Sequence, residues 1–125
     1  MRWRVTHTID APRAVVERRL LSSERIESAP RALRTVREAK LLRSERVGRA
    51  VRYEARFAVR DAVLPPALRR FAGAVAWVER VTSNLATHAG TFAVEPELPA
   101  ALRRRVRCQG SYTLRALDAQ RTERE

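Results

Sequence analysis

The chain has 125 residues, enough for one domain, and its 45% hydrophobic and 32% charged side chains are typical of a globular protein, not a disordered or fibrous one. No segment approaches the roughly 20 apolar residues that span a bilayer, and the N-terminus lacks a signal-peptide pattern, so we expect a cytoplasmic protein. The net charge is +12, but Lys40 is the only lysine among 26 basic residues. Such an arginine bias is more typical of a GC-rich genome than of a nucleic-acid-binding surface.

The N-terminal part predicts one strand and two helices. Residues 2–9 alternate strictly, which is typical of a half-buried strand. Its apolar face would carry Trp3, Val5, His7 and Ile9. The Asp10-Ala11-Pro12 segment is typical of a helix start, and apolar residues at helical spacing predict a helix as far as Leu21. A second short helix is expected over residues 23–29.

Strands dominate the rest of the sequence. They are predicted over residues 36–47, 50–60, 74–82, 86–95 and 106–116. The clearest is 50–60, where apolar and charged residues alternate, as in an antiparallel sheet with one solvated face. We expect turns at Gly48 and at Ser83-Asn84. A short helical turn is expected over residues 67–72.

The order of these elements predicts an α+β fold. One curved antiparallel sheet of about six strands would carry two short helices, placed after its first strand, on its apolar face. That face would include Tyr53, Phe57, Trp77, Phe92 and Tyr112.

Three segments of the sequence, together with this order of elements, indicate a known superfamily. The opening "VTHTIDAPRAVVERRLLSSE" carries a first strand followed by an I-D-A-P helix start, and "LPPALRRFAGAVAWVERVTSN" and "RRRVRCQGSYTL" lie further on. The chain resembles the START-like (SRPBCC) superfamily of helix-grip folds, which includes polyketide cyclases, and within it an uncharacterised bacterial branch. The resemblance covers nearly the whole chain. It implies a curved sheet around a long C-terminal helix, with a hydrophobic cavity between them.

The sequence departs from that pattern at its end. The resemblance implies a complete seventh strand and a long helix, whereas the chain ends at Glu125. We therefore expect residues 1–125 to form a single, C-terminally truncated START-like domain without this helix. Its concave face would then expose aromatic side chains, and a homodimer could cover this open face.

Eight residues are the candidate ligand-binding site. They are His7, Tyr53, Phe57, Trp77, Glu79, His88, Phe92 and Tyr112. The aromatic rings would supply apolar walls and two hydroxyl groups, and Glu79 is the only acid on the inward phase of its strand. Either histidine could be a general base. All eight could instead be structural. The aromatic rings could be core residues, the histidines could be semi-buried polar groups, and Glu79 could return to solvent at a bulge.

The remaining features favour no specific chemistry. Cys108 is expected to be a small buried core residue, and the basic run at Arg103-Arg104-Arg105 with Arg107 is expected to be a solvated face. No catalytic, nucleotide or metal-binding motif occurs, so we expect no cofactor and no metal. We predict non-catalytic binding of a hydrophobic or amphipathic small molecule, lipid-like or polyketide-like. One alternative is a polyketide cyclase or dehydratase. The other is an arginine-rich surface that binds an acidic partner or nucleic acid, of which nucleic acid is disfavoured.

Overall fold

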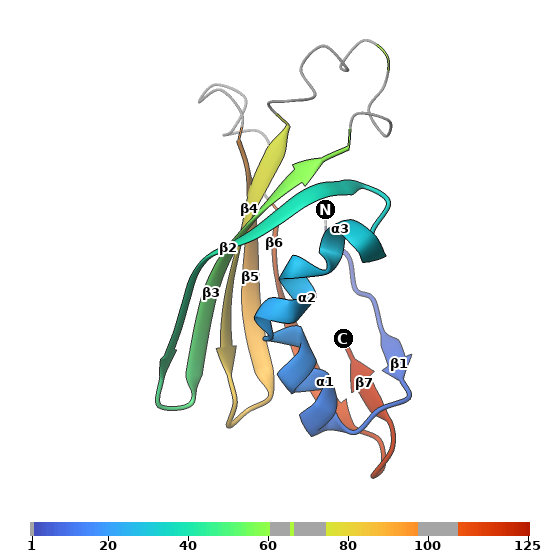
Figure 1. The fold of residues 1–125 in the computed structure, drawn as a ribbon. Helices are drawn as coiled ribbons and strands as arrows, with labels where there is room; N and C mark the ends of the chain where they lie inside the picture. Colours follow the sequence, from blue (N-terminus) through green and yellow to red (C-terminus); the bar gives the residue numbers. More distant parts are fainter. Residues whose placement is uncertain (1, 61–65, 67–74, 98–107) are drawn as a thin grey trace.

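The described residues of the protein form one seven-stranded antiparallel sheet and three short helices (Figure 1). This computed structural model describes residues 2–60, 66, 75–97 and 108–125. The strands are β1 (His7–Ile9), β2 (Val36–Val47), β3 (Ala50–Val59), β4 (Ala76–Asn84), β5 (Ala89–Pro96), β6 (Cys108–Ala116) and β7 (Thr122–Arg124). The helices are α1 (Arg13–Leu20), α2 (Ser23–Glu27) and α3 (Ala29–Ala32). The order across the sheet is β1-β7-β6-β5-β4-β3-β2.

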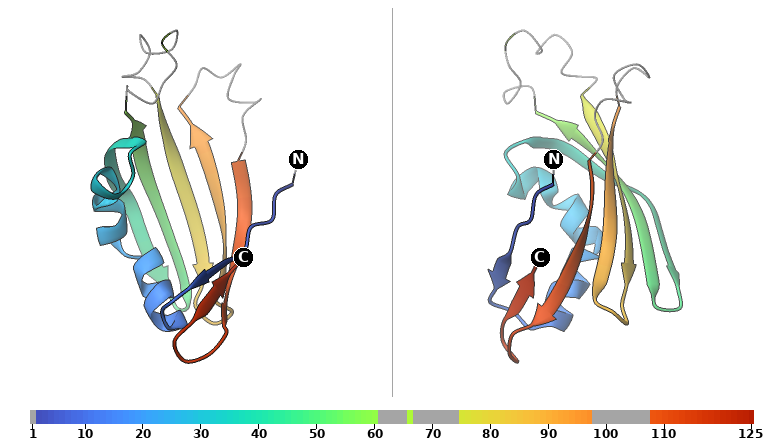
Figure 2. Two further views of the ribbon diagram at one scale, coloured as in Figure 1. Left: turned by 90° about the vertical axis from the view of Figure 1, so that its right-hand side faces the viewer. Right: turned by 180° about the vertical axis from the view of Figure 1, so that it is seen from behind.

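The long strands β2 to β5 follow from their alternating side chains and from short connections. A two-residue turn joins β2 to β3, and in it Gly48 has a φ of +59°, a conformation that glycine adopts without steric cost. Two register shifts in the β2–β3 ladder, at Val36/Glu38 and Leu41/Arg43, are bulges of the kind that bend a strand. The sheet accordingly curves toward the helices (Figure 2).

The helices cover the concave face of the sheet. Helix α1 packs against β6, whereas α2 and α3 pack against β2, so the three helices bridge the concavity from one side to the other. The core between these layers contains Val16, Ile26, Ala29, Val36, Tyr53, Ala55, Phe57, Val81, Tyr112 and Leu114. The expected exposure of the inward aromatic rings is therefore wrong for Tyr53, Phe57 and Tyr112, whose exposed fractions are 4%, 4% and 8%.

The convex face carries charged residues that alternate with the core positions. Arg56 forms an ion pair with Glu97 at 2.7 Å, and Arg80 lies 2.5 Å from Glu95 and 3.4 Å from Glu54. Partly exposed pairs of this kind contribute at most about 1 kcal/mol each. They do, however, neutralise part of the positive charge on this face.

The strand and helix counts differ from the sequence prediction. There are seven strands, not six, because the three-residue β7 lies between β1 and β6. There are three helices after β1, not two, because the predicted 23–29 segment ends at Glu27 and a separate turn of helix begins at Ala29 with Pro30 near its start. The backbone amides of the first helical turn have no partner within the helix. A proline there therefore loses no hydrogen bond and readily starts a helix.

Two predicted strand ends are also wrong. The first strand covers His7–Ile9 only, and Trp3 and Val5 are 80% and 56% exposed. The turn between β4 and β5 occupies residues 85–88, two residues later than predicted, because the Asn84 side chain accepts a hydrogen bond from the amide of Ala86 (2.8 Å). The predicted helical turn at 67–72 and the basic run of Arg103-Arg104-Arg105 with Arg107 lie outside the described residues.

Close packing around Gly90 gives a stability prediction. A Cβ atom at Gly90 would lie 2.7 Å from Cε1 of Tyr112 and 2.8 Å from the backbone oxygen of Thr82. Because the backbone oxygen cannot rotate away, we expect Gly90→Ala to lower the free energy of unfolding by about 1–2 kcal/mol, within the usual range for overpacking.

Gly110→Ala is the matched comparison, since the three atoms nearest to its Cβ atom would all belong to the ring of Phe92. That ring can turn aside, so we expect a smaller loss of stability than for Gly90→Ala. Urea denaturation of both variants measures the difference. Equal losses would contradict this explanation.

Candidate functional site

A cavity of about 220 Å³ lies inside the curve of the sheet, between the α1–α2 segment and strands β3 to β6. Its apolar walls are formed by Leu20, Leu21, Val81, Phe92 and Val94. Its polar groups are those of Arg25, Tyr53, Glu79, Tyr112 and Arg124. We call this space the inner cavity. An apolar space with a few polar groups is the usual character of a small-molecule site.

Three of the polar side chains form a connected network. The Arg25 guanidinium donates a hydrogen bond to the Tyr53 hydroxyl (2.6 Å), and that hydroxyl donates to a carboxylate oxygen of Glu79 (3.2 Å). Arg25 and Glu79 also form an ion pair at 3.8 Å. The network joins helix α2 to strands β3 and β4, so it fixes the helix over the floor of the inner cavity.

Burial keeps the Tyr53 hydroxyl protonated. Its pKa is raised from 10 to about 12, first because burial disfavours the phenolate and second because the Glu79 carboxylate lies beside it. The nearby Arg25 guanidinium acts in the opposite direction without cancelling these effects. At neutral pH Tyr53 is therefore a hydrogen-bond donor and not a base.

Helix α2 places Arg25 through local contacts. The Ser22 side chain accepts a hydrogen bond from the Arg25 amide (3.3 Å), which is the usual role of a serine at a helix start. The guanidinium Nε of Arg25 also donates to the backbone oxygen of Leu20 (3.1 Å). The next residue, Ile26, is buried against the sheet.

The C-terminal side of the inner cavity contains an aromatic ring and a second arginine. The hydroxyls of Tyr112 and Ser83 are hydrogen-bonded. The Arg124 guanidinium carbon lies 5.5 Å from the centroid of the Tyr112 ring, within the range of a cation–π contact. Both residues also line a second, larger space.

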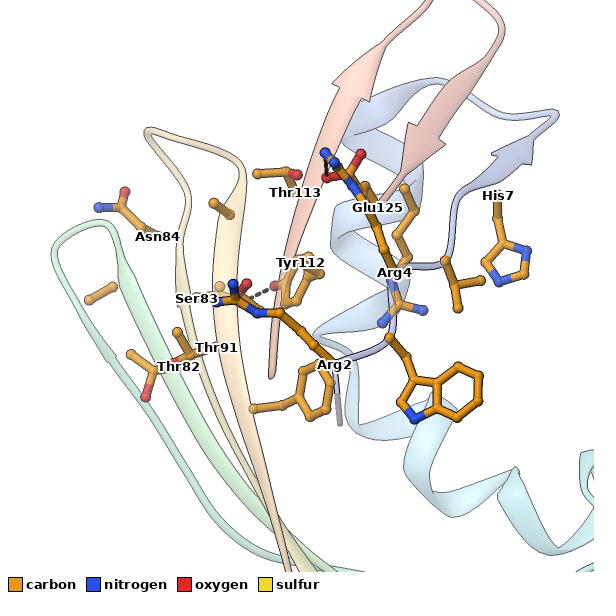
Figure 3. A pocket seen from close by; sticks show the side chains of 18 residues that line it. Arg2, Arg4, His7, Thr82, Ser83, Asn84, Thr91, Tyr112, Thr113 and Glu125 are labelled. Carbon is orange, nitrogen blue, oxygen red and sulfur yellow. Dashed lines mark hydrogen bonds and ion pairs between the residues drawn. The ribbon is translucent and has the colours of Figure 1, made fainter. Parts of the chain in front are cut away.

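This second space is an open groove of about 1120 Å³ between residues 2–7 and the ends of strands β4 to β6 (Figure 3). We call it the outer groove. It shares Phe92, Tyr112 and Arg124 with the inner cavity. An ion pair between Arg4 and Glu125 (2.5 Å) ties the N-terminal segment to the end of β7.

The structure separates the predicted site residues into groups. Tyr53, Glu79, Phe92 and Tyr112 all line the inner cavity. Phe57 and Trp77 line neither space; their rings stack with centroids 5.4 Å apart and planes 15° apart, and Phe57 is buried. This pair lies in the core or packs against it.

The two histidines differ from the prediction. His7 was expected on an apolar strand face, but it is exposed and lines only the outer groove, where Arg4 lies between it and Tyr112 in the view of Figure 3. His88 was expected within a strand, but it lies in the β4–β5 turn with a φ of +54°. Its Nδ1 atom is 3.1 Å from both carboxylate oxygens of Glu17, so His88 connects helix α1 to this turn.

The predicted site left out six residues of the inner cavity: Leu20, Leu21, Arg25, Val81, Val94 and Arg124. The leucines were recognised as apolar helix residues, but not as a cavity wall. No sequence motif distinguished Arg25 and Arg124 from the many other arginines. The one available signal for Arg124 was its spacing of two residues from Thr122, which places both on one strand face.

Other features of the described residues bear on function. Cys108 is exposed, contrary to the prediction of a buried thiol. In the described ranges, no three His, Cys, Asp or Glu side chains cluster as metal ligands. None of the described helices is long and apolar enough to cross a membrane.

Comparison with known proteins gives a likeness in fold to solved structures. No family model matches the sequence, and no curated protein matches it. A solved structure, the di-domain ARO/CYC StfQ from the steffimycin biosynthetic pathway, superposes with a TM-score of 0.56 at 19% sequence identity. The match covers 96% of this chain and 34% of that chain, so the present chain spans about a third of the di-domain protein. At this identity the likeness concerns the fold alone, which is compatible with the helix-grip fold that the sequence suggested.

Proposed function

We propose that the protein binds an amphipathic small molecule in the inner cavity without transforming it. The observation that carries this proposal is the Arg25–Tyr53–Glu79 network, which lines a cavity together with apolar walls formed by Leu20, Leu21, Val81, Phe92 and Val94. Apolar walls favour a hydrocarbon portion of the ligand by about 25 cal/mol per Å² of buried surface. The polar network offers orienting hydrogen bonds at one end.

Non-catalytic binding fits the state of the polar groups better than catalysis does. The Arg25 and Glu79 charges oppose each other across the Tyr53 hydroxyl. Tyr53 remains protonated at neutral pH, so it cannot accept a proton from a ligand, and its single O–H is already donated to Glu79. Neither histidine lines the inner cavity, so neither is placed as a base there.

The same network favours a cyclase-type or dehydratase-type enzyme as the second candidate. Three polar side chains converge on one cavity, which such chemistry requires, and the likeness to the ARO/CYC structure agrees in fold. The two candidates differ in what happens to the bound molecule. Chromatography with mass spectrometry of a ligand recovered after incubation distinguishes them. An unchanged mass and retention time support binding, a changed retention time at the same mass supports cyclisation, and a mass loss of water supports dehydration.

Narrowing the inner cavity is expected to weaken binding. Val94 lines the cavity, whereas its neighbour Ala93 is exposed on the opposite face of β5. We expect Val94→Phe to reduce the affinity for a small neutral amphipath, octan-1-ol, by about tenfold or more, which corresponds to about 1.4 kcal/mol. Isothermal titration measures this.

Ala93→Phe is the matched control for that experiment. It adds the same ring to the convex face, so we expect the probe affinity to stay at the wild-type value. A comparable loss in both variants would indicate a general effect on folding. Unchanged binding in Val94→Phe would remove the inner cavity as the site.

A further inference from the structure

Strand β7 directs Arg124 toward the concave side of the sheet. Thr122 is fully buried, and its hydroxyl donates to the backbone oxygen of Ala11 (2.7 Å). Side chains two residues apart on a strand share a face, so Arg124 lies on the same side as Thr122. The contact of its guanidinium with Tyr112 is consistent with this direction.

Arg124 differs from the other charged groups on this side of the sheet because it has no acidic partner. Arg25 is paired with Glu79, and Glu17 is bonded to His88. The neighbouring Glu125 pairs with Arg4. Within the described part of the chain, Arg124 makes no ion pair with a carboxylate, and neither does Arg2, which lines the outer groove. Arg124 is therefore the one unmatched positive charge that lines the inner cavity.

A solvated surface arginine would not have the environment of Arg124. The residue is half-buried, packs over the face of Tyr112 and lines both the inner cavity and the outer groove. Partial desolvation makes a guanidinium more attractive to an anion, because water screens the charge less. Packing on a ring also restricts the planar group, which leaves its donors oriented for a two-pronged hydrogen bond.

We propose that the bound amphipath is a monoanion, and that its carboxylate pairs with Arg124 where the inner cavity and the outer groove share residues. This inference rests on the proposed function and names the class of ligand. The hydrocarbon tail lies against Leu21, Val81 and Val94. A single negative charge matches the single unmatched positive charge of the inner cavity.

The volume of the inner cavity sets the scale of the tail. At about 30 Å³ for each water-sized group, 220 Å³ accommodates on the order of seven methylene or methyl groups. Octanoate, with seven carbons beyond its carboxylate, is therefore a suitable probe. Octan-1-ol has a similar tail and no charge, so it is the matched neutral probe.

Isothermal titration of octanoate and octan-1-ol into the purified chain tests the assignment. We expect the wild-type protein to bind octanoate about tenfold more tightly than octan-1-ol, since hydrogen bonds between charged groups are roughly twice as strong as neutral ones. Arg124→Gln should remove this preference, with a much larger loss of affinity for octanoate than for octan-1-ol. Arg124→Lys should restore part of the preference, because it restores the charge but not the fork of donors.

Arg115→Gln is the control, since Arg115 is an exposed arginine on the neighbouring strand β6. It should retain the wild-type preference for octanoate. If octan-1-ol binds the wild type as tightly as octanoate does, or if Arg124→Gln loses affinity for both equally, the carboxylate assignment is wrong while the binding function stands. If neither probe binds the wild-type protein, the proposed function itself fails.

Discussion

Raising the pH from 10 to 12 is expected to reduce the free energy of unfolding by about 2 kcal/mol through Tyr53 alone. The pKa of this hydroxyl is about 12 in the folded protein, against 10 in the unfolded chain. Between these values the unfolded chain loses the proton and the folded protein keeps it, so alkali favours unfolding. The contribution is fully present below pH 10 and is lost as the pH approaches 12, at about 1.36 kcal/mol per pKa unit.

Urea denaturation at several pH values between 9 and 12 measures this loss. Tyr53→Phe is the comparison, because it removes the titrating hydroxyl and keeps the ring. Its overall stability will differ from the wild type, since the bonds to Arg25 and Glu79 are lost. The decisive quantity is the slope against pH, which should be shallower in the variant. Equal slopes would show that Tyr53 titrates normally.

Absorbance at the phenolate band gives a second measurement of the same hydroxyl. The chain contains only two tyrosines, Tyr53 and Tyr112. The difference between the alkaline titrations of wild type and Tyr53→Phe therefore reports Tyr53 directly. A midpoint near pH 12 for this difference agrees with a buried hydroxyl beside a carboxylate.

The centre of the sheet could be predicted from the sequence because its side chains have one clear period. In β3, Tyr53, Ala55 and Phe57 are all buried, and the charged residues between them lie on the other face. Both faces of this strand are specified by the pattern, so a shift by one residue would bury arginines. The prediction of residues 50–60 differs from the observed strand by one residue at its end.

The edges of the sheet could not be predicted in the same way. Residues 2–6 alternate as a strand does, yet Trp3 and Val5 are exposed, because alternation does not ensure a pairing neighbour. Strand β7 is the reverse case, a paired strand without a recognisable alternating pattern. Its three residues are too few to show a period, and only pairing with β1 and β6 makes them a strand.

Site residues could be predicted when the alternation of a strand determines which way their side chains face. They were missed when their place in the site depends on how a helix packs on the sheet. Glu79 could be recognised because it is the one acid among inward-facing positions of β4. Arg25 lies on a helix, and its partner Tyr53 is 28 residues away. Which arginine meets that tyrosine depends on how α2 packs across the sheet. The sequence carries no periodic signal for such a contact.

Replacing Ile26 by alanine is expected to cause the largest effect among these predictions, a loss of about 3 kcal/mol in the free energy of unfolding. Ile26 is 2% exposed and belongs to the core cluster. Truncation of a buried isoleucine removes its apolar contacts and leaves a cavity, with typical costs of about 2–5 kcal/mol. Ile26→Val removes one methylene and should cost about 0.5–1.5 kcal/mol.

Ile26 matters for the inner cavity as well as for the stability of the fold, because it holds helix α2 in place. Helix α2 has five residues, far fewer than the dozen or so that an isolated helix needs to be stable in water. Its place over the inner cavity must therefore come from packing, and Ile26 is its buried residue. Because Arg25 is the preceding residue, loss of the anchor should also loosen the hydrogen bond from Arg25 to Tyr53.

Two measurements separate this effect from a general loss of stability. At a temperature where Ile26→Ala remains folded, we expect it to bind octan-1-ol more weakly than the wild type does. We also expect its Tyr53 to titrate at a lower pH, since a loosened α2 covers the hydroxyl less and burial is the main cause of its raised pKa. Val36→Ala is the matched control, because Val36 is a buried core residue of β2 that does not line the cavity. It should destabilise the protein while leaving the Tyr53 titration near that of the wild type. If both variants shift Tyr53 equally, the hydroxyl responds to the whole core, and α2 has no special part in holding the site.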